Sequence, residues 1–296
     1  MTDWLIPALL APMLWAFVVL IDDNLLRNVF RNAYFGGIAA GLFALIPLLI
    51  LLVLPHTIPA WPVLVAAIAA GLATTCFYFL LFRSLELAEP SIVTAISMLA
   101  TAFVPVMAWL VVGEQLGVYQ LIGLAVLVVS SVAMSLLDAR GFRPNRALYI
   151  MAGGSVLYAA AAVAMKYVYG EVDYRSGYLF FAAGMVLGGL FLMTATKPGR
   201  GFIATARGFS LNVWGFIVVG ELLNVCAEAL QGLAVSRGPV SLVRALEGLQ
   251  PAWVLLIALI LFPFWPRYFR EAAGAHRGAK FACFAVIIVG VIMVAR

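Results

Sequence analysis

The stretch SLVRALEGLQP, residues 241–251, is similar to SIVTAISMLAT, residues 91–101. Aligned at an offset of 150 residues, from 91 to 241, the two stretches share identical residues at Ser91 and Ser241, Val93 and Val243, Ala95 and Ala245, and Leu99 and Leu249. Only the later stretch is charged, because Arg244 replaces Thr94 and Glu247 replaces Ser97. The similarity predicts that one structural unit occurs twice, with the charges in one copy.

Other matches extend this relationship along the chain. They are LWA (14–16) with LYA (157–159), GIAAG (37–41) with GMVLG (184–188), and AVLVV (125–129) with AVIIV (285–289). The offset grows in chain order, as two diverged copies with loop insertions would show. Shared composition of apolar helices is the alternative explanation, and it does not account for the preserved order.

The composition predicts an all-α integral membrane protein. The chain is 65% hydrophobic and 10% charged, with a mean hydropathy of +1.10, whereas soluble proteins carry about 25% charged residues. Apolar runs of bilayer-spanning length recur throughout. We predict ten transmembrane helices, at about 4–21, 33–54, 60–82, 91–112, 117–137, 147–169, 177–196, 210–235, 239–262 and 279–295. The first is expected to be a retained helix, because no basic region or small-residue cleavage site marks a signal peptide.

Five spans in each copy predict an inverted repeat. An odd number of spans places the second copy upside down relative to the first, so we expect two inverted five-helix repeats, residues 1–138 and 139–296. Inverted repeats are typical of secondary transporters, whose substrates bind near mid-membrane between the halves.

The loop charges predict the orientation. Most of the 18 Lys and Arg residues fall in alternate loops, at Arg27, Arg31, Arg83, Arg140, Arg143, Arg146, Lys197, Arg200, Arg207, Arg267, Arg270, Arg277 and Lys280. Cytoplasmic loops carry this excess. We therefore expect a multi-pass protein of the plasma (inner) membrane with both termini outside the cytoplasm. The net charge of +5 belongs to these loops and does not indicate nucleic-acid binding.

The cysteines and histidines indicate neither a metal site nor a cofactor. Cys76, Cys226 and Cys283 lie in separate predicted spans and are expected to be buried small hydrophobes. His56 and His276 lie in loops on opposite predicted sides of the membrane.

A polar stripe in the eighth predicted span marks the candidate site. Glu221, Asn224, Glu228 and Gln231 recur at helical spacing and share an arc of about 80°. Ionisable residues inside a membrane are costly and indicate function. This stripe should face a cavity or a polar partner helix.

Further polar residues are expected to complete that site. They are Arg244 and Glu247 in the ninth span, Tyr158 and Lys166 in the sixth, Tyr78 in the third and Thr94 in the fourth. Arg244 suits a carboxylate or phosphate, and a glutamate could bind an amine or a proton, so groups of both signs suit a zwitterion. The alternative is a purely structural pair between Arg244 and a glutamate, Glu247 at i+3 or one of the eighth span.

Two motifs carry a resemblance to a known family. The stretch GPVSLVRALEGLQP (238–251) and the Gly113-Glu114 step before the fifth span resemble the drug/metabolite transporter superfamily, EamA-like branch. The resemblance covers the whole chain and implies a transporter fold. The second copy lacks the Gly-Glu step and has a long basic connection there instead. Many members keep both termini inside, which the loop charges here contradict.

The leading functional hypothesis is a secondary transporter of a small polar or zwitterionic metabolite. The alternative is a flippase for a lipid-linked, polyprenyl-phosphate-type substrate, in which Arg244 and Lys166 would hold the phosphate. Clustered catalytic side chains and a nucleotide-binding GxxxxGK[ST] motif are absent from the sequence, which disfavours an enzyme or an ATP-driven pump. The inverted repeat disfavours a channel. The oligomeric state, including a homodimer, stays open.

Overall fold

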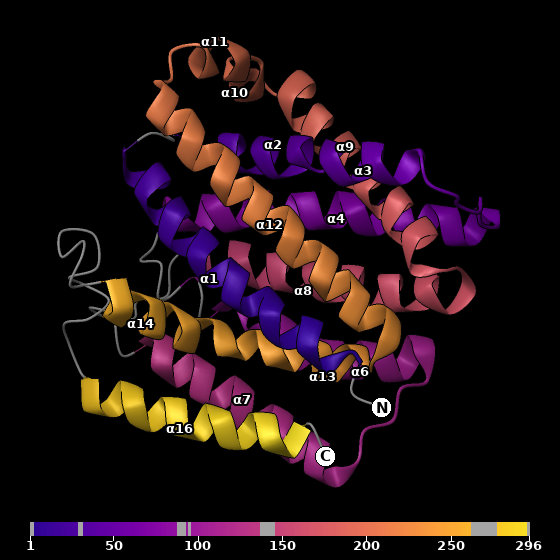
Figure 1. Cartoon of the computed structure of the whole chain (residues 1–296), viewed down its shortest axis with the longest axis vertical. Coiled ribbons are helices and arrows are strands. Elements are labelled where there is room, and N and C mark those ends of the chain that lie inside the picture. Colours follow the sequence, from indigo (N-terminus) through magenta and orange to yellow (C-terminus); the bar gives the residue numbers. More distant parts are fainter. Residues whose placement is uncertain are drawn as a thin grey trace.

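The computed structural model describes residues 3–28, 32–87, 93, 96–136, 146–261 and 277–294, and these residues form helices without a strand. Figure 1 shows the helices packed side by side as a bundle. In chain order they are α1 (Leu5–Asn28), α2 (Ala33–Phe43), α3 (Leu45–Leu52), α4 (Trp61–Leu85), α6 (Leu99–Val112), α7 (Val118–Leu136), α8 (Arg146–Glu171), α9 (Tyr174–Ala195), α10 (Lys197–Arg200), α11 (Phe202–Ala206), α12 (Leu211–Arg237), α13 (Val240–Ala245), the 3-10 helix η1 (Leu246–Leu249), α14 (Gln250–Leu261) and α16 (Arg277–Val294).

The helices follow the predicted spans closely. Within the described residues, six segments are long and apolar enough to cross a membrane: α1, the α2–α3 pair, α4, α8, α9 and α12. Shorter apolar helices lie at Leu99–Val112, Val118–Ala133 and Phe281–Val294, inside three further predicted spans. A multi-pass helical membrane protein is therefore confirmed, whereas the count of ten spans stays a prediction.

Two spans that were expected to be continuous are broken. The second predicted span divides at Ala44 into α2 and α3. Pro47 has no N–H to donate to the carbonyl of Phe43, four residues earlier, so the helix is interrupted there. The ninth predicted span contains η1 between α13 and α14, and η1 ends two residues before Pro251. Pro251 has no N–H to donate to the carbonyl of Glu247, four residues earlier. That carbonyl accepts the N–H of Gln250 instead.

Helices from the two halves pack in reciprocal pairs. Helix α1 packs on α12 and on α14, while α8, at the equivalent place in the second half, packs on α4 and on α6. Helices α2 and α9 pack on each other, as do α7 and α16. Figure 1 shows α1 and α12 running alongside one another across the molecule. Each of these contacts thus has a counterpart when the two predicted copies are exchanged.

Successive loops along the chain lie at alternate ends of the bundle. At one end the N–H of Ala33 donates to Glu86 Oε1 at 2.5 Å, and the rings of Phe35 and Phe202 lie 5.3 Å apart. At the other end the hydroxyl of Ser176 accepts the N–H of Thr57 at 2.8 Å. There Asp173 begins α9 as its N-cap, and hydrogen bonds from Ser176 lower the pKa of its carboxyl group. The loops predicted to be cytoplasmic lie at the first end, so far as they fall within the described residues.

Small residues allow close contact between the halves. A Cβ on Gly184 would lie 2.2 Å from the carbonyl oxygen of Ile68 on α4, and one on Gly41 would lie 2.6 Å from Cα of Gly189. Both glycines belong to the repeated Gly-x-x-x-Gly pattern, whose spacing favours close helix packing in lipid.

The expectation for the cysteines was wrong in one respect. Cys76 and Cys226 are exposed on the outside of the bundle and Cys283 is half-buried, whereas all three were expected to be buried. An exposed side chain in the middle of a membrane helix faces lipid, where a small apolar thiol is as stable as in a protein core. Hydropathy alone does not separate these two apolar surroundings.

Candidate functional site

The polar stripe of α12 faces the interior of the bundle. Asn224, Glu228 and Gln231 are respectively 5%, 5% and 1% exposed, although α12 also carries lipid-facing apolar residues. Buried polar groups require partners, and the neighbouring helices supply most of them.

Arg244 forms the centre of one half of the buried network. Its Nη1 donates to Glu247 Oε1 at 2.5 Å, and Gln231 Nε2 donates to the same oxygen at 2.7 Å. The guanidinium lies 4.2 Å from the ring centroid of Tyr158, which in turn stacks on Phe77. A cation over an aromatic face is attracted by the ring quadrupole. The positive charge is therefore balanced by one carboxylate and one ring.

Tyr78 connects the two halves of the chain at the other end of this network. Its hydroxyl lies 2.6 Å from Glu228 Oε1 and 3.0 Å from Asn224 Oδ1. Asn224 Oδ1 also accepts the indole N–H of Trp15 at 2.9 Å. Tyr78 and Glu228 occupy the same position in the two predicted copies, so two residues related by the offset of 150 contact each other directly.

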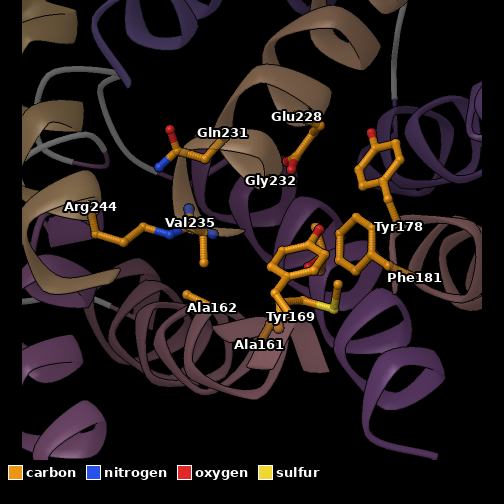
Figure 2. Close-up of a pocket in the computed structure, with 12 residues that line it drawn as sticks. Ala161, Ala162, Tyr169, Tyr178, Phe181, Glu228, Gln231, Gly232, Val235 and Arg244 are labelled. Atoms are coloured by element: carbon orange, nitrogen blue, oxygen red, sulfur yellow. The ribbon is translucent and has the colours of Figure 1, made fainter. Parts of the chain in front are cut away.

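A small cavity lies between these groups. About 20 Å³ is accessible to the centre of a water molecule, room for about one water. Figure 2 shows Arg244 reaching toward the cavity from one side and Glu228 and Gln231 from α12, while the rings of Tyr169, Tyr178 and Phe181 close another side. The rest of the lining is Thr74, Ala161, Ala162, Met165, Gly232 and Val235.

The predicted site residues divide into three groups. Glu228, Gln231 and Arg244 line the cavity. Tyr78, Asn224, Tyr158 and Glu247 do not line it but contact the residues that do, or lie one step behind them. Lys166 and Glu221 belong to neither group, and Thr94 lies outside the described residues.

Lys166 and Glu114 bind the connection between α12 and α13. Lys166 Nζ donates to the carbonyls of Val235 at 3.0 Å and Gly238 at 2.8 Å. The carboxylate of Glu114 accepts the N–H groups of Val240 at 2.8 Å and Ser241 at 3.0 Å. A cation at the end of α12 and an anion at the start of α13 both complement the helix dipoles. Lys166 was predicted in the substrate site, but its ammonium group is occupied by backbone carbonyls.

Glu221 lies about two turns from the cavity along α12. It lies three residues before Asn224, on the same face of α12. Its Oε2 is buried without a hydrogen-bond partner among the described residues. It extends the polar stripe without lining the cavity.

The aromatic wall of the cavity was missed in the sequence. Tyr174, Tyr178 and Phe181 form a continuous stack on α9, with centroids 5.6 Å apart at each step, and Tyr169 of α8 joins it 5.7 Å from Tyr174. The spacing of the α9 rings at i, i+4 and i+7 places them on one helix face. That spacing was the available signal, and it was hidden because the surrounding residues are also apolar.

Comparison with known proteins assigns the first part of the chain to a family. Residues 2–136 match the EamA-like transporter family. The predicted resemblance is thereby confirmed for the EamA-like segment, which contains Tyr78, Thr74 and the Gly113-Glu114 step. The matched family is one of membrane transporters, and the match covers residues 2–136.

Solved structures support the fold over the whole length. Among 29 matching chains, one described as "Crystal structure of protein" aligns with a TM-score of 0.71 at 17% identity, over 99% of this chain and 96% of the other. One known fold therefore covers both residues 2–136 and the remainder of the chain. No curated protein sequence matches the chain.

Proposed function

We propose that the chain is a secondary transporter that moves a small polar or zwitterionic metabolite, similar to an amino acid in size and charge, by alternating access. The observation that carries the proposal is that Glu228 and Arg244, of opposite charge, line one buried cavity within the bundle. Buried charges in membrane helices mark the paths of substrates and ions. A carboxylate and a guanidinium in one cavity suit the amine and the carboxylate of a zwitterion.

The reciprocal packing of the helices supports two inverted repeats, residues 1–138 and 139–296. Each contact of α1 with the second half has its counterpart in a contact of α8 with the first half. Tyr78 and Glu228, at matching positions in the two copies, hydrogen-bond to each other where the halves meet. Transporters built this way alternate access by moving one repeat against the other around a fixed site.

The size of the cavity indicates that the halves must separate to admit a solute. About 20 Å³ suffices for one water, whereas ligand pockets usually enclose about 300–1,000 Å³. Helix η1 lies next to Arg244 and Glu247 and interrupts α-helical bonding there. Short 3-10 segments within helices often mark hinges, so we propose that this interruption accompanies the opening.

The alternative flippase receives no support from the geometry. It requires Lys166 and Arg244 to hold one phosphate, but Lys166 Nζ binds the carbonyls of Val235 and Gly238 and does not line the cavity with Arg244. We further propose that the protein lies in the plasma membrane with both termini outside the cytoplasm, as the loop charges indicate.

A ligand screen followed by flux measurement tests the proposed function. Purified protein in detergent would be heated with amino acids, amines, organic acids, sugar phosphates and polyprenyl phosphates, and each hit measured again with Arg244→Ala and Glu228→Gln. We expect a soluble metabolite to raise the melting temperature of the wild type but not of the two variants, and to enter proteoliposomes that contain the wild type. Stabilisation by polyprenyl phosphates alone, or an absence of flux for every soluble hit, would overturn the proposal.

A further inference from the structure

The buried charges in and around the cavity do not cancel. Arg244 is already paired with Glu247 at 2.5 Å, and Glu247 is only 7% exposed. Glu228 is 5% exposed, and the hydrogen bond that it makes comes from Tyr78, a neutral donor. Among the described residues, the buried network therefore contains one cation and two carboxylates. A singly charged cation entering the cavity would neutralise it.

The cavity also offers hydrogen-bond acceptors. Gln231 Oε1 is buried without a partner, and Gln231 is 1% exposed. The carboxylate of Glu228 accepts the Tyr78 hydroxyl on Oε1, and each oxygen of a carboxylate can accept more than one hydrogen bond. The two residues lie three positions apart on α12, on one helix face. An ammonium group carries three donors and no acceptor, and so complements such a pair.

The opposite wall is aromatic. Tyr169, Tyr178 and Phe181 line the cavity, and the Tyr178 and Phe181 rings are stacked with centroids 5.6 Å apart. Aromatic faces attract ammonium groups by cation–π interaction, most strongly where water is excluded. Acidic and aromatic groups together are thus arranged around one small space.

We propose that this cavity is the binding site for the ammonium group of the substrate, with Glu228 as counter-ion, Gln231 as second acceptor and Tyr169, Tyr178 and Phe181 as the aromatic wall. The inference rests on the proposed transport function and narrows its substrate class. A protonated amine is the required element of the substrate, and a substrate carboxylate is optional because Arg244 is neutralised within the protein. Amino acids and simple amines both satisfy this requirement, whereas organic acids and sugar phosphates do not.

Matched series of compounds test the requirement on the wild-type protein. Leucine is compared with 3-methylbutylamine, which lacks the carboxylate, and with 4-methylpentanoate, which lacks the amine; phenylalanine is compared with 2-phenylethylamine and 3-phenylpropionate. We expect binding, measured by thermal shift and isothermal titration, of the amine-bearing members of at least one series and of neither acid. Each compound is tested at about 10 mM, which is high enough to detect millimolar affinity. If none of the four amine-bearing compounds binds, the inference is overturned.

Variants assign the binding to the cavity. Glu228→Gln removes the counter-ion and should weaken amine binding about 10- to 100-fold, while Glu171→Gln, the same change at an exposed residue of α8, should leave it unchanged. Tyr169→Leu should weaken it about three- to tenfold and Tyr169→Phe, which keeps the ring, less than about twofold. Equal affinity in Glu228→Gln and wild type would place the ammonium group elsewhere.

The two proposals fail in different ways. If an organic acid or sugar phosphate binds in an Arg244-dependent manner and is transported, the transporter proposal stands and the ammonium site is wrong. If proteoliposomes transport no soluble compound of any class, the transporter proposal itself is wrong.

Discussion

At the residue scale, the pair of Arg244 and Glu247 determines how the charges are tolerated inside the membrane. Both side chains are 9% exposed, and their contact is 2.5 Å long. Removing two charges from water costs several kcal/mol per ion, which only a close pair with further hydrogen bonds can offset. Gln231 and the ring of Tyr158 provide those additional contacts. Breaking the pair on one side should therefore be worse than removing both charges.

A double-mutant cycle tests this dependence. We expect Glu247→Leu to reduce the free energy of unfolding by about 3–5 kcal/mol, because Arg244 is left buried without a carboxylate partner at hydrogen-bonding distance. The double variant Arg244→Met, Glu247→Leu should recover a large part of that loss, since no buried charge of the pair remains. Thermal denaturation in detergent measures both. Additive losses would mean that the two residues act independently.

At the element scale, two residues of one loop connect the halves of the chain. Gly113, at φ +67°, ends α6 in the left-handed conformation that glycine adopts without strain. The turn directs Glu114 to the first N–H groups of α13, more than a hundred residues later. The Gly-Glu step lies at the end of α6, but the helix whose start it stabilises, α13, belongs to the second half of the chain.

Removal of this carboxylate should loosen the start of α13. We expect Glu114→Ala to lower the free energy of unfolding by about 1–2 kcal/mol, as loss of an N-cap does, and Glu114→Gln to cost less because one acceptor oxygen remains. Thermal denaturation of both variants, with Glu171→Gln as a surface control, measures the effect. A loss for Glu171→Gln as large as that for Glu114→Ala would show that carboxylates in general, and not this contact, matter.

Glycines provide a second test at the same scale. Gly184→Ala places a methyl group 2.2 Å from the carbonyl oxygen of Ile68, so α9 and α4 must move apart; Gly153→Ala on α8 meets nothing within 4 Å. We expect a loss of more than about 2 kcal/mol for the former and a change between zero and a gain of about 1 kcal/mol for the latter. Thermal denaturation and expression level measure the difference. Similar stability of the two variants would contradict the close packing of α9 on α4.

Local patterns predicted the elements better than the site. Hydropathy located the helices, because bilayer thickness fixes the length of a spanning run, and the spacing of Asn224, Glu228 and Gln231 identified the buried face of α12. The helix breaks at Ala44 and η1 depend on which groups donate hydrogen bonds to the freed backbone carbonyls. One example is the hydroxyl of Ser131 on α7, which donates to the carbonyl of Gly248. The role of Lys166 depends on which helix end lies beside it. These are tertiary facts that the spacing along one helix does not contain.

At the scale of the whole molecule, the proposed inverted repeat would explain why the charges lie in one copy. Where two similar halves meet, equivalent residues approach each other, as Tyr78 and Glu228 do. A carboxylate in both copies would put two like charges side by side in a low-dielectric interior, which is strongly unfavourable. A phenol opposite a carboxylate forms a hydrogen bond instead. If the two halves are diverged copies, as we propose, this contact favours a neutral donor in one and a charge in the other.

The proposed orientation is the remaining property of the whole molecule, and thiol labelling decides it. In a variant with Cys76, Cys226 and Cys283 replaced by serine, single cysteines would be introduced as Asp3→Cys near the N-terminus and as Arg200→Cys at the opposite end of the bundle, both at exposed positions. Because basic loops stay in the cytoplasm, we expect a membrane-impermeant maleimide to label Asp3→Cys in intact cells and Arg200→Cys only after permeabilisation. The reverse pattern would place both termini inside and show that the loop charges do not set the topology of this chain.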